Sequence, residues 1–330
     1  MKQSKFSIWM RWRWIVLLII ILVLGFASSL FIPWNVNALS SHPQPAQNYD
    51  EAVVRIETLL ANRASEMNPN CLVQFMTHGQ KVQKAIVLVH GYTSCPAQFR
   101  ELGQDFYDLG YNVLIAPLPH HGLADRMTDE QAQLTADELA EYADEIVDIA
   151  QGLGDQVSMI GISAGGVTTS WAAQNRSDID TALIISPAFG FLQIPTPFTA
   201  PVMNALLLLP NSYEWWDPVL QADIGPLHAY PRYSKHALAQ TLRLGFAVQG
   251  EARRSAPAAH RLIVVTNPND TSVNNLMTAQ VVTNWQAHNA NITTYEFPLS
   301  LKLGHDLIDP AQPDQQIDIV YPQLIDLITQ

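Results

Sequence analysis

Residues 161–165 read Gly-Ile-Ser-Ala-Gly, and their types and spacing suit covalent chemistry. They follow a strand-like run, 157–160, and precede a helix-like run, 166–173. On such a strand–turn–helix segment a serine hydroxyl is exposed, and the first amides of the helix can donate to a developing negative charge. The segment predicts Ser163 as a nucleophile and the amide of Ala164 as an oxyanion donor. A plain glycine-rich turn is the alternative.

A serine nucleophile needs a base that takes its proton and a third group that orients the base. Asp270 ends a strand-like run through a short turn, and His305 is the only one of ten histidines beyond the last strand-like run. The order serine, acid, histidine is that of one known type of triad. We therefore predict Ser163, Asp270 and His305 as the catalytic residues, with Asp306 or Asp309 as alternatives for the acid.

A second oxyanion donor should come from the loop at residues 90–96, which reads His-Gly-Tyr-Thr-Ser-Cys-Pro after an apolar run. The glycine allows the backbone to approach a substrate, so we expect the amide of Tyr92 to be this donor. We expect His90 to hold the loop by hydrogen bonds and not to act as the base.

Strand-like and helix-like runs alternate along most of the chain, which predicts an α/β fold around a mostly parallel sheet flanked by helices. The strand-like runs are 72–76, 85–89, 112–116, 157–160, 181–185, 262–266 and 292–297. The helix-like runs are 49–66, 97–109, 136–149, 164–175, 274–288 and about the last fifteen residues. Thr135 and Glu138 have the spacing of a capping box at the start of the third of these helices.

About seventy apolar, proline-rich residues between Pro187 and His260 lack clear strands. Because this interval is too long for a simple loop, we predict a mostly helical lid at residues 190–258. It would be inserted after the strand that follows Ser163, which we expect to be the sixth strand of the fold. Its apolar side chains would line a substrate pocket. The candidates are Phe189, Phe191, Leu206–Leu209, Trp215 and Trp216.

The chain begins with four cations followed by an apolar run at residues 14–32, about the length that crosses a bilayer as a helix. The first charge after this run is Asp50, so the positive-inside rule places the remainder outside the cytoplasm. We predict one uncleaved N-terminal transmembrane helix, flanked by tryptophans. A cleaved signal peptide, and hence a secreted protein, is the alternative.

The charge of the chain excludes some classes of binding partner. The first 32 residues carry four basic and no acidic residues, so the other 298 carry 14 basic and 30 acidic residues, a net charge of −16. That charge disfavours nucleic acid as a partner, and the sequence has no nucleotide-binding or metal-binding motif, so we expect no cofactor and no metal.

Cys71 and Cys95 form a disulfide in an oxidising compartment, or they are two unrelated thiols.

Together these segments resemble the α/β-hydrolase superfamily, in particular its monoglyceride-lipase-like and serine-aminopeptidase-like branch. The resemblance spans about residues 71–330 and rests on five segments: 86–99, 119–122, 161–166, 269–273 and 304–305. It implies a hydrolase core with a lid after the sixth strand. It also implies the family roles for the three catalytic residues and the two oxyanion amides named above.

The sequence thus predicts a membrane-anchored serine hydrolase of carboxylic esters, with a small acyl ester or lipid-like molecule as substrate. A peptidase, an acyltransferase, a non-catalytic binding protein and a membrane-assembly factor are the alternatives. Three regions are expected. They are the anchor and tether at 1–38, a linker and leading helix at 39–70, and the hydrolase domain at 71–330.

Overall fold

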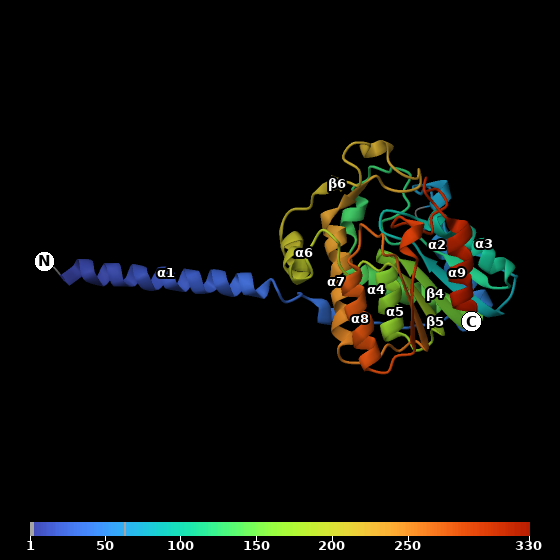
Figure 1. Cartoon of the computed structure of the whole chain (residues 1–330), viewed down its shortest axis with the longest axis horizontal. Helices are drawn as coiled ribbons and strands as arrows, with labels where there is room; N and C mark the ends of the chain where they lie inside the picture. The colour runs from blue at the N-terminus through green and yellow to red at the C-terminus, as the bar shows by residue number, and fades with distance from the viewer. Residues whose placement is uncertain (1–2, 63) are drawn as a thin grey trace.

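The computed structural model describes residues 3–62 and 64–330. A long helix, α1 (Gln3–Ser29), projects from a body in which helices cover both faces of one sheet (Figure 1). The strands of that sheet are β1 (Gln74–Met76), β2 (Val82–Val89), β3 (Asn112–Ile115), β4 (Gly154–Ile162), β5 (Thr181–Ile185), β8 (Arg261–Thr266) and β9 (Ile292–Glu296). These elements confirm the predicted α/β fold.

The seven strands lie in the order β1-β3-β2-β4-β5-β8-β9. Only β1 is antiparallel to its neighbour, and the other pairs are parallel. The carboxyl ends of β4 and β8 therefore lie at the same edge of the sheet, so the residues that follow these strands are brought near each other. This edge carries the candidate site.

Alternate residues of each buried strand face opposite sides of the sheet, as strand geometry requires. In β2, Ile86 and Leu88 pack with one cluster, whereas Val87 and Val89 pack with the other. The first cluster includes α3 (Arg100–Asp108) and α9 (Ile317–Thr329). The second includes α2 (Tyr49–Ala61), α4 (Ala136–Leu153), α5 (Ala164–Asn175), α7 (Lys235–Ala252) and α8 (Asn275–Ala287). Two buried cores result, one on each face.

Helix α4 begins as predicted. The side chain of Thr135 accepts a hydrogen bond from the amide of Glu138, and the carboxylate of Glu138 accepts one from the amide of Thr135. This capping box satisfies amides that the first turn of a helix leaves unpaired.

The inserted segment differs from the prediction in three ways. It follows β5, the strand after Ser163 and α5 as expected, but this is the fifth strand among the described residues and not the sixth. It contains α6 (Thr199–Leu208) but also a small antiparallel sheet of β6 (Tyr213–Trp215) and β7 (Arg232–Ser234), which is too short to give a strand pattern. Its last helix, α7, packs on α4 and α5. Since α7 belongs to the helical layer of the body, the covering segment is shorter than 190–258.

Residues 39–48, the first part of the expected linker, are docked on the body. The amides of His42 and Gln44 donate to the carboxylates of Asp144 and Asp148 on α4, at 2.5 and 2.7 Å. The same two carboxylates bind the fully buried guanidinium of Arg176. Because a buried charge needs such partners, the pairing anchors this segment to the body. The sequence pattern does not reveal it, since the partners are about a hundred residues away.

Candidate active site

Ser163 stands in a strained turn between β4 and α5. Its φ of 57° and ψ of −116° lie outside the regions that ordinary residues adopt. The turn is held at both ends, because the amide of Ser163 donates to the carbonyl of Ile185 and its carbonyl accepts from the amides of Val167 and Ala188. This geometry is that of the strand–turn–helix segment expected from the sequence.

The two glycines that flank Ser163 are required by close packing. A Cβ atom at Gly161 would lie 2.2 Å from the carbonyl oxygen of Gly165, and one at Gly165 would lie 2.2 Å from the carbonyl oxygen of Val89. No side chain fits at either position. The spacing of the motif therefore reflects how tightly β4, α5 and the end of β2 pack together.

The loop after β2 approaches the serine. A Cβ atom at Gly91 would lie 3.6 Å from the Cβ atom of Ser163. Among residues 3–62 and 64–330, the amides of Tyr92 and Ala164 donate to no other group. Two buried amides are thus free to bind an oxygen beside Ser163.

His90 has the structural role expected for it. Its Nε2 accepts from the amide of Leu118 at 2.8 Å, and its Nδ1 lies 2.8 Å from the carbonyl oxygen of Gly91. Full burial, with the nearby His121, lowers the pKa of His90 well below its usual value. A neutral imidazole with both nitrogens occupied holds the loop and cannot serve as a base.

His305 and Asp270 meet at the carboxyl edge of the sheet. Nδ1 of His305 lies 2.7 Å from Oδ2 of Asp270. The other carboxylate oxygen of Asp270 accepts from the amides of Ser272 and Val273, which fixes its orientation. The alternative acids are engaged elsewhere, Asp306 with Gln98 and Asp309 with His228.

The charges of this pair support each other. Burial disfavours protonation of His305, but the hydrogen bond to Asp270 and its negative charge outweigh burial and raise the pKa of His305 above its usual value of 6.5. Burial also opposes ionisation of Asp270, but the bond to His305, its charge and two backbone amides lower the pKa of Asp270 below 3.8. Asp270 is therefore an anion at neutral pH.

Two further residues hold this region, and their roles were not expected from the sequence. The side chain of Asn267 donates to the carbonyls of Leu303 and Gly304, which joins the turn before Asp270 to the loop of His305. The side chain of Gln98 accepts from the amide of Gly91 and donates to Asp306. Both side chains are fully buried amides, and a buried polar group in a structure indicates a hydrogen-bonding role. The spacing of residues in the sequence does not show which amides are buried.

One cavity of about 760 Å³ joins these groups. Ser163, His305, Tyr92 and Ala164 all line it. Such a volume is within the range of sites for small organic ligands. A histidine held by a carboxylate, a half-buried serine and two free amides at one cavity are the groups that acyl transfer requires.

The inserted segment supplies much of the apolar wall. Of the candidates, Phe191, Leu206, Trp215 and Trp216 line the cavity, whereas Leu207–Leu209 do not. Phe189 does not line it. It is buried beside α7, where a Cβ atom at Gly245 would lie 3.4 Å from its ring. The prediction for Phe189 is therefore wrong, because the chain turns inward at this residue.

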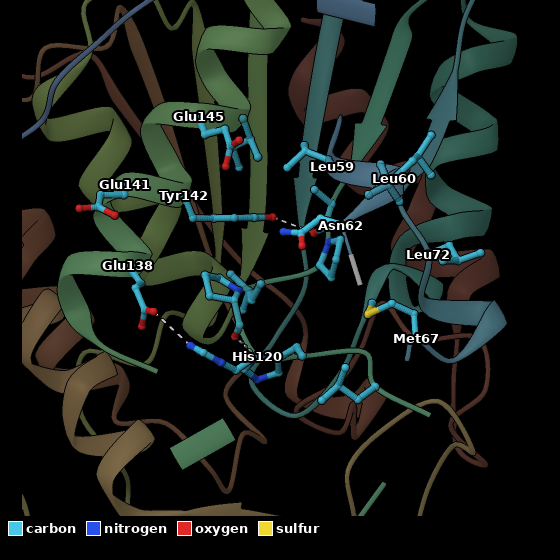
Figure 2. Close-up of a pocket in the computed structure, with 18 residues that line it drawn as sticks. Leu59, Leu60, Asn62, Met67, Leu72, His120, Glu138, Glu141, Tyr142 and Glu145 are labelled. Carbon is cyan, nitrogen blue, oxygen red and sulfur yellow. Dashed lines mark hydrogen bonds and ion pairs between the residues drawn. The ribbon is translucent and has the colours of Figure 1, made fainter. Parts of the chain in front are cut away.

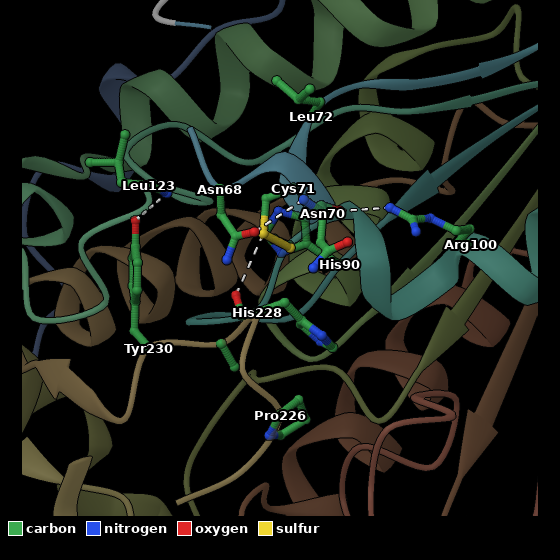
Figure 3. Close-up of a disulfide and its surroundings, with 12 residues drawn as sticks. Asn68, Asn70, Cys71, Leu72, His90, Arg100, Leu123, Pro226, His228 and Tyr230 are labelled. Atoms are coloured by element: carbon green, nitrogen blue, oxygen red, sulfur yellow. Dashed lines mark hydrogen bonds between the residues drawn. A yellow bond between two sulfur atoms is a disulfide. The ribbon is translucent and has the colours of Figure 1, made fainter. Parts of the chain in front are cut away.

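Cys71 and Cys95 form a disulfide with a Cα–Cα distance of 5.3 Å (Figure 3). The bond joins the segment before β1 to the loop after β2, which carries Tyr92. Sγ of Cys71 also lies 3.5 Å from the carbonyl oxygen of His228 in the inserted segment. The disulfide thus fixes the loop that carries Tyr92 from outside the cavity.

A second cavity, of about 320 Å³, lies between α2 and α4 (Figure 2). His120 lies between two carboxylates there, with its Nε2 3.1 Å from Glu138 and its Nδ1 3.5 Å from Glu130. None of the predicted site residues lines this cavity. Among the described residues no group of three or more His, Cys, Asp or Glu side chains could hold a metal ion.

Comparisons with known proteins bear on the fold. None of the curated proteins matches the sequence. Solved structures with low sequence identity share the fold of this chain. A structure described with the metagenome-derived lipolytic enzymes LipS and LipT has a TM-score of 0.61 at 18% identity, over 80% of this chain and 99% of that one. The monoacylglycerol lipase of Paleococcus ferrophilus has a TM-score of 0.58 at 16% identity, over 78% and 97%. A soluble variant of the monoglyceride lipase of Saccharomyces cerevisiae, in complex with a substrate analog, has a TM-score of 0.53 at 15% identity, over 78% and 90%.

The family assignment comes from a family model. The model of the Alpha/beta hydrolase family matches residues 86–318, which include every residue of the proposed site. This range covers well over half of the chain. The chain therefore belongs to the alpha/beta hydrolase family.

Proposed function

We propose that this protein is a serine hydrolase that cleaves carboxylic esters through an acyl-enzyme. The observation that carries the proposal is the hydrogen bond between His305 and Asp270 at the cavity that Ser163 also lines. The hydrolase domain would be residues 71–330. The part of the predicted lid (190–258) that precedes α7 would cover the cavity.

In the proposed reaction, His305 takes the proton of Ser163 while the serine oxygen attacks the ester carbonyl. Asp270 keeps the imidazole oriented and stabilises the imidazolium that forms. The amides of Tyr92 and Ala164 donate to the oxyanion of the tetrahedral intermediate. His305 then gives its proton to the departing alcohol, and a water molecule repeats the sequence on the acyl-enzyme.

The apolar wall favours an acyl chain over a charged peptide. Phe191, Leu206, Trp215 and Trp216 supply apolar surface at the cavity. Burial of each methylene of an acyl chain contributes about 0.8 kcal/mol. The described structures of monoacylglycerol lipases and lipolytic enzymes share this fold and support a lipid-like ester as substrate.

We also propose that α1 anchors the protein and that the body lies outside the cytoplasm. The segment Trp9–Ser29 is a helix long and apolar enough to cross a membrane, and none of it is buried against the body. The disulfide is of a kind that persists in oxidising compartments. A signal peptide remains the alternative to an anchor.

A fluorophosphonate probe tests the catalytic proposal directly. We expect the probe to label the full chain and a Ser163→Ala variant to remain unlabelled. Hydrolysis of esters of increasing acyl length, compared with aminoacyl substrates, then separates an esterase from a peptidase. Equal labelling of Ser163→Ala would refute the assignment of the nucleophile.

A further inference from the structure

The end of α1 is held by one buried asparagine of α6. Nδ2 of Asn204 donates to the carbonyls of Leu30 and Ile32, both at 2.8 Å, and Oδ1 accepts from the amide of Trp34 at 3.3 Å. The side chain has no exposed surface. Leu30 and Ile32 directly follow the last helical residue, Ser29, so Asn204 fixes the turn that leads out of α1 from a segment about 170 residues away.

Two other contacts fix the same junction. The guanidinium of Arg243 on α7 donates to the carbonyl of Asn35 at 2.9 Å and pairs with Asp137 on α4. The rings of Phe31 and Phe198 lie 6.1 Å apart. The direction of α1 relative to the body is therefore set by packing and hydrogen bonds, and not left to a flexible linker.

This junction lies at the end of the apolar span. The segment long enough to cross a membrane ends at Ser29, and Asn204 binds residues 30 and 32. Beyond a helix the chain extends at most about 3.6 Å per residue, so the carbonyls that Asn204 binds lie within about 11 Å of the end of this span. Figure 1 shows α6 on the side of the body from which α1 departs.

Helix α6 is apolar on both of its sides. Val202 and Leu206 line the cavity of the proposed site. On the outside, Phe198, at the start of the helix, and Leu208 and Leu209, at its end, have 52%, 57% and 58% of their surface exposed. The helix contains no charged residue, and its two polar residues, Thr199 and Asn204, are buried. A helix that is apolar all round is normally covered on all sides.

We propose that the outer face of α6, defined by Phe198, Leu208 and Leu209, lies in the bilayer interface, and that Asn204 holds it there. The bilayer is the occupant because the face continues from the end of the span. A bilayer of zwitterionic lipids, which has no net charge, suits this face, because the body carries a net charge of −16 and is repelled by anionic lipids. Helix α6 then separates the bilayer from the cavity, with apolar residues facing each.

This inference rests on the proposed membrane anchor and deepens the proposed function. It places the ester-cleaving cavity directly beside the lipid phase, which makes esters dissolved in the bilayer the substrate class that reaches Ser163. The face itself can be tested without any measurement of catalysis.

Single cysteines on the full chain report what covers this face. Both native cysteines are in the disulfide, so Leu208→Cys, Leu209→Cys and the control Val219→Cys each add one free thiol for an environment-sensitive fluorophore. Val219 is 89% exposed in the loop between β6 and β7. The proteins carry Ser163→Ala and are reconstituted into phosphatidylcholine vesicles.

Lipids with a spin label near the headgroup should quench the fluorophore at 208 and 209 much more strongly than at 219, and aqueous iodide should do the reverse. Iodide quenching at 208 and 209 equal to that at 219 would overturn the proposal. Probes at 208 and 209 that are shielded from both quenchers would also overturn it, because a protein would then cover the face.

The role of Asn204 needs a second variant. In Leu209→Cys, the added change Asn204→Ala should reduce quenching by the spin-labelled lipids, while a probe at Leu22→Cys in α1 remains quenched by lipids with a spin label in the acyl chain. Unchanged quenching at 209 would refute the role of Asn204. A probe at Leu22 that lipids labelled in the acyl chain do not quench would refute the anchor. A face quenched by lipids in a wild-type chain that cleaves no ester would refute only the proposed function.

Discussion

The side chain of Gln98 donates a hydrogen bond of 3.1 Å to the carboxylate of Asp306, which is the residue next to the proposed base His305. The same side chain accepts from the amide of Gly91 at 2.8 Å, in the loop that carries the amide of Tyr92. One buried glutamine thus joins the loop of Tyr92, the proposed oxyanion donor, to the loop of His305. It is a positioning residue, because its bonds go to these loops.

Replacing Gln98 should loosen both loops. In Gln98→Leu the amide of Gly91 and the carboxylate of Asp306 lose a buried partner, which costs about 1–3 kcal/mol of stability. Loss of a whole oxyanion donor costs about 10²–10³ in rate, so we expect the displaced Tyr92 amide to lower kcat about ten- to a hundredfold. Ester hydrolysis and urea unfolding measure the two effects. Gln104→Leu, at an exposed position on α3, is the control and should change neither.

The identity of the acid can be tested by comparing two aspartates. In Asp270→Asn the imidazole loses the partner that orients it, and kcat should fall by about 10⁴. In Asp306→Asn the oxygen that accepts from Gln98 is kept, so kcat should fall far less. An equal loss in the two variants, both folded by circular dichroism, would contradict the assignment of Asp270.

The pH dependence follows from the pKa of His305. The base must be neutral to accept the proton of Ser163, and Asp270 raises the pKa of His305 above 6.5. The value of kcat/KM should therefore rise with pH to a plateau, with a midpoint above 6.5. The residual activity of Asp270→Asn should have a midpoint at lower pH, because the cause of the shift is removed. A wild-type midpoint below 6.5 would contradict the charge pairing.

The same two groups affect stability with opposite signs. Because the pKa of His305 is higher in the folded protein, its contribution is present below about pH 6.5 and is lost as pH rises through the folded pKa. Because the pKa of Asp270 is lower in the folded protein, its contribution is present above about pH 4 and is lost as pH falls through the folded pKa. Urea unfolding of wild type and Asp270→Asn across this range should show the difference between them largest near pH 5–6.

The disulfide should stabilise the fold. It closes a loop between residues separated by 24 positions, for which the chain-entropy model gives about 3.5 kcal/mol. The double variant Cys71→Ser/Cys95→Ser should lose about this much free energy of unfolding in urea. It should also lose activity at lower temperature than the wild type, because the bond fixes the loop of Tyr92. Wild-type stability in the double variant would show that the bond adds nothing.

The apolar wall predicts a preference by chain length. Leu206→Ala removes side-chain surface at the cavity, so hydrolysis of long-chain esters should fall more than hydrolysis of acetyl esters. We expect a change of about tenfold in the ratio of the two kcat/KM values, since a lost apolar contact of this size contributes 1–3 kcal/mol. Val219→Ala, outside the cavity, should leave the ratio unchanged. An equal loss on both esters would place the acyl chain elsewhere.

The sequence by itself determined the fold class and the local elements that position the proposed site. Alternation of period two in the strands and the helical spacing between them are properties of neighbouring residues, so the core strands and the turn at Ser163 could be predicted to within a few residues. The same local logic identified the capping box at Thr135 and the loop at Tyr92. Both depend on spacing alone.

Tertiary structure decided what depends on residues far apart in the chain. Whether Asp270 or Asp306 faces His305, whether Phe189 reaches the cavity and where residues 39–48 dock are set by packing between distant segments. The polar contacts of Gln98, Asn204 and Asn267 join residues that lie between 7 and about 170 positions apart. Such side chains carry no periodic pattern, because a single buried hydrogen bond depends on the meeting of two surfaces and not on the sequence around either one.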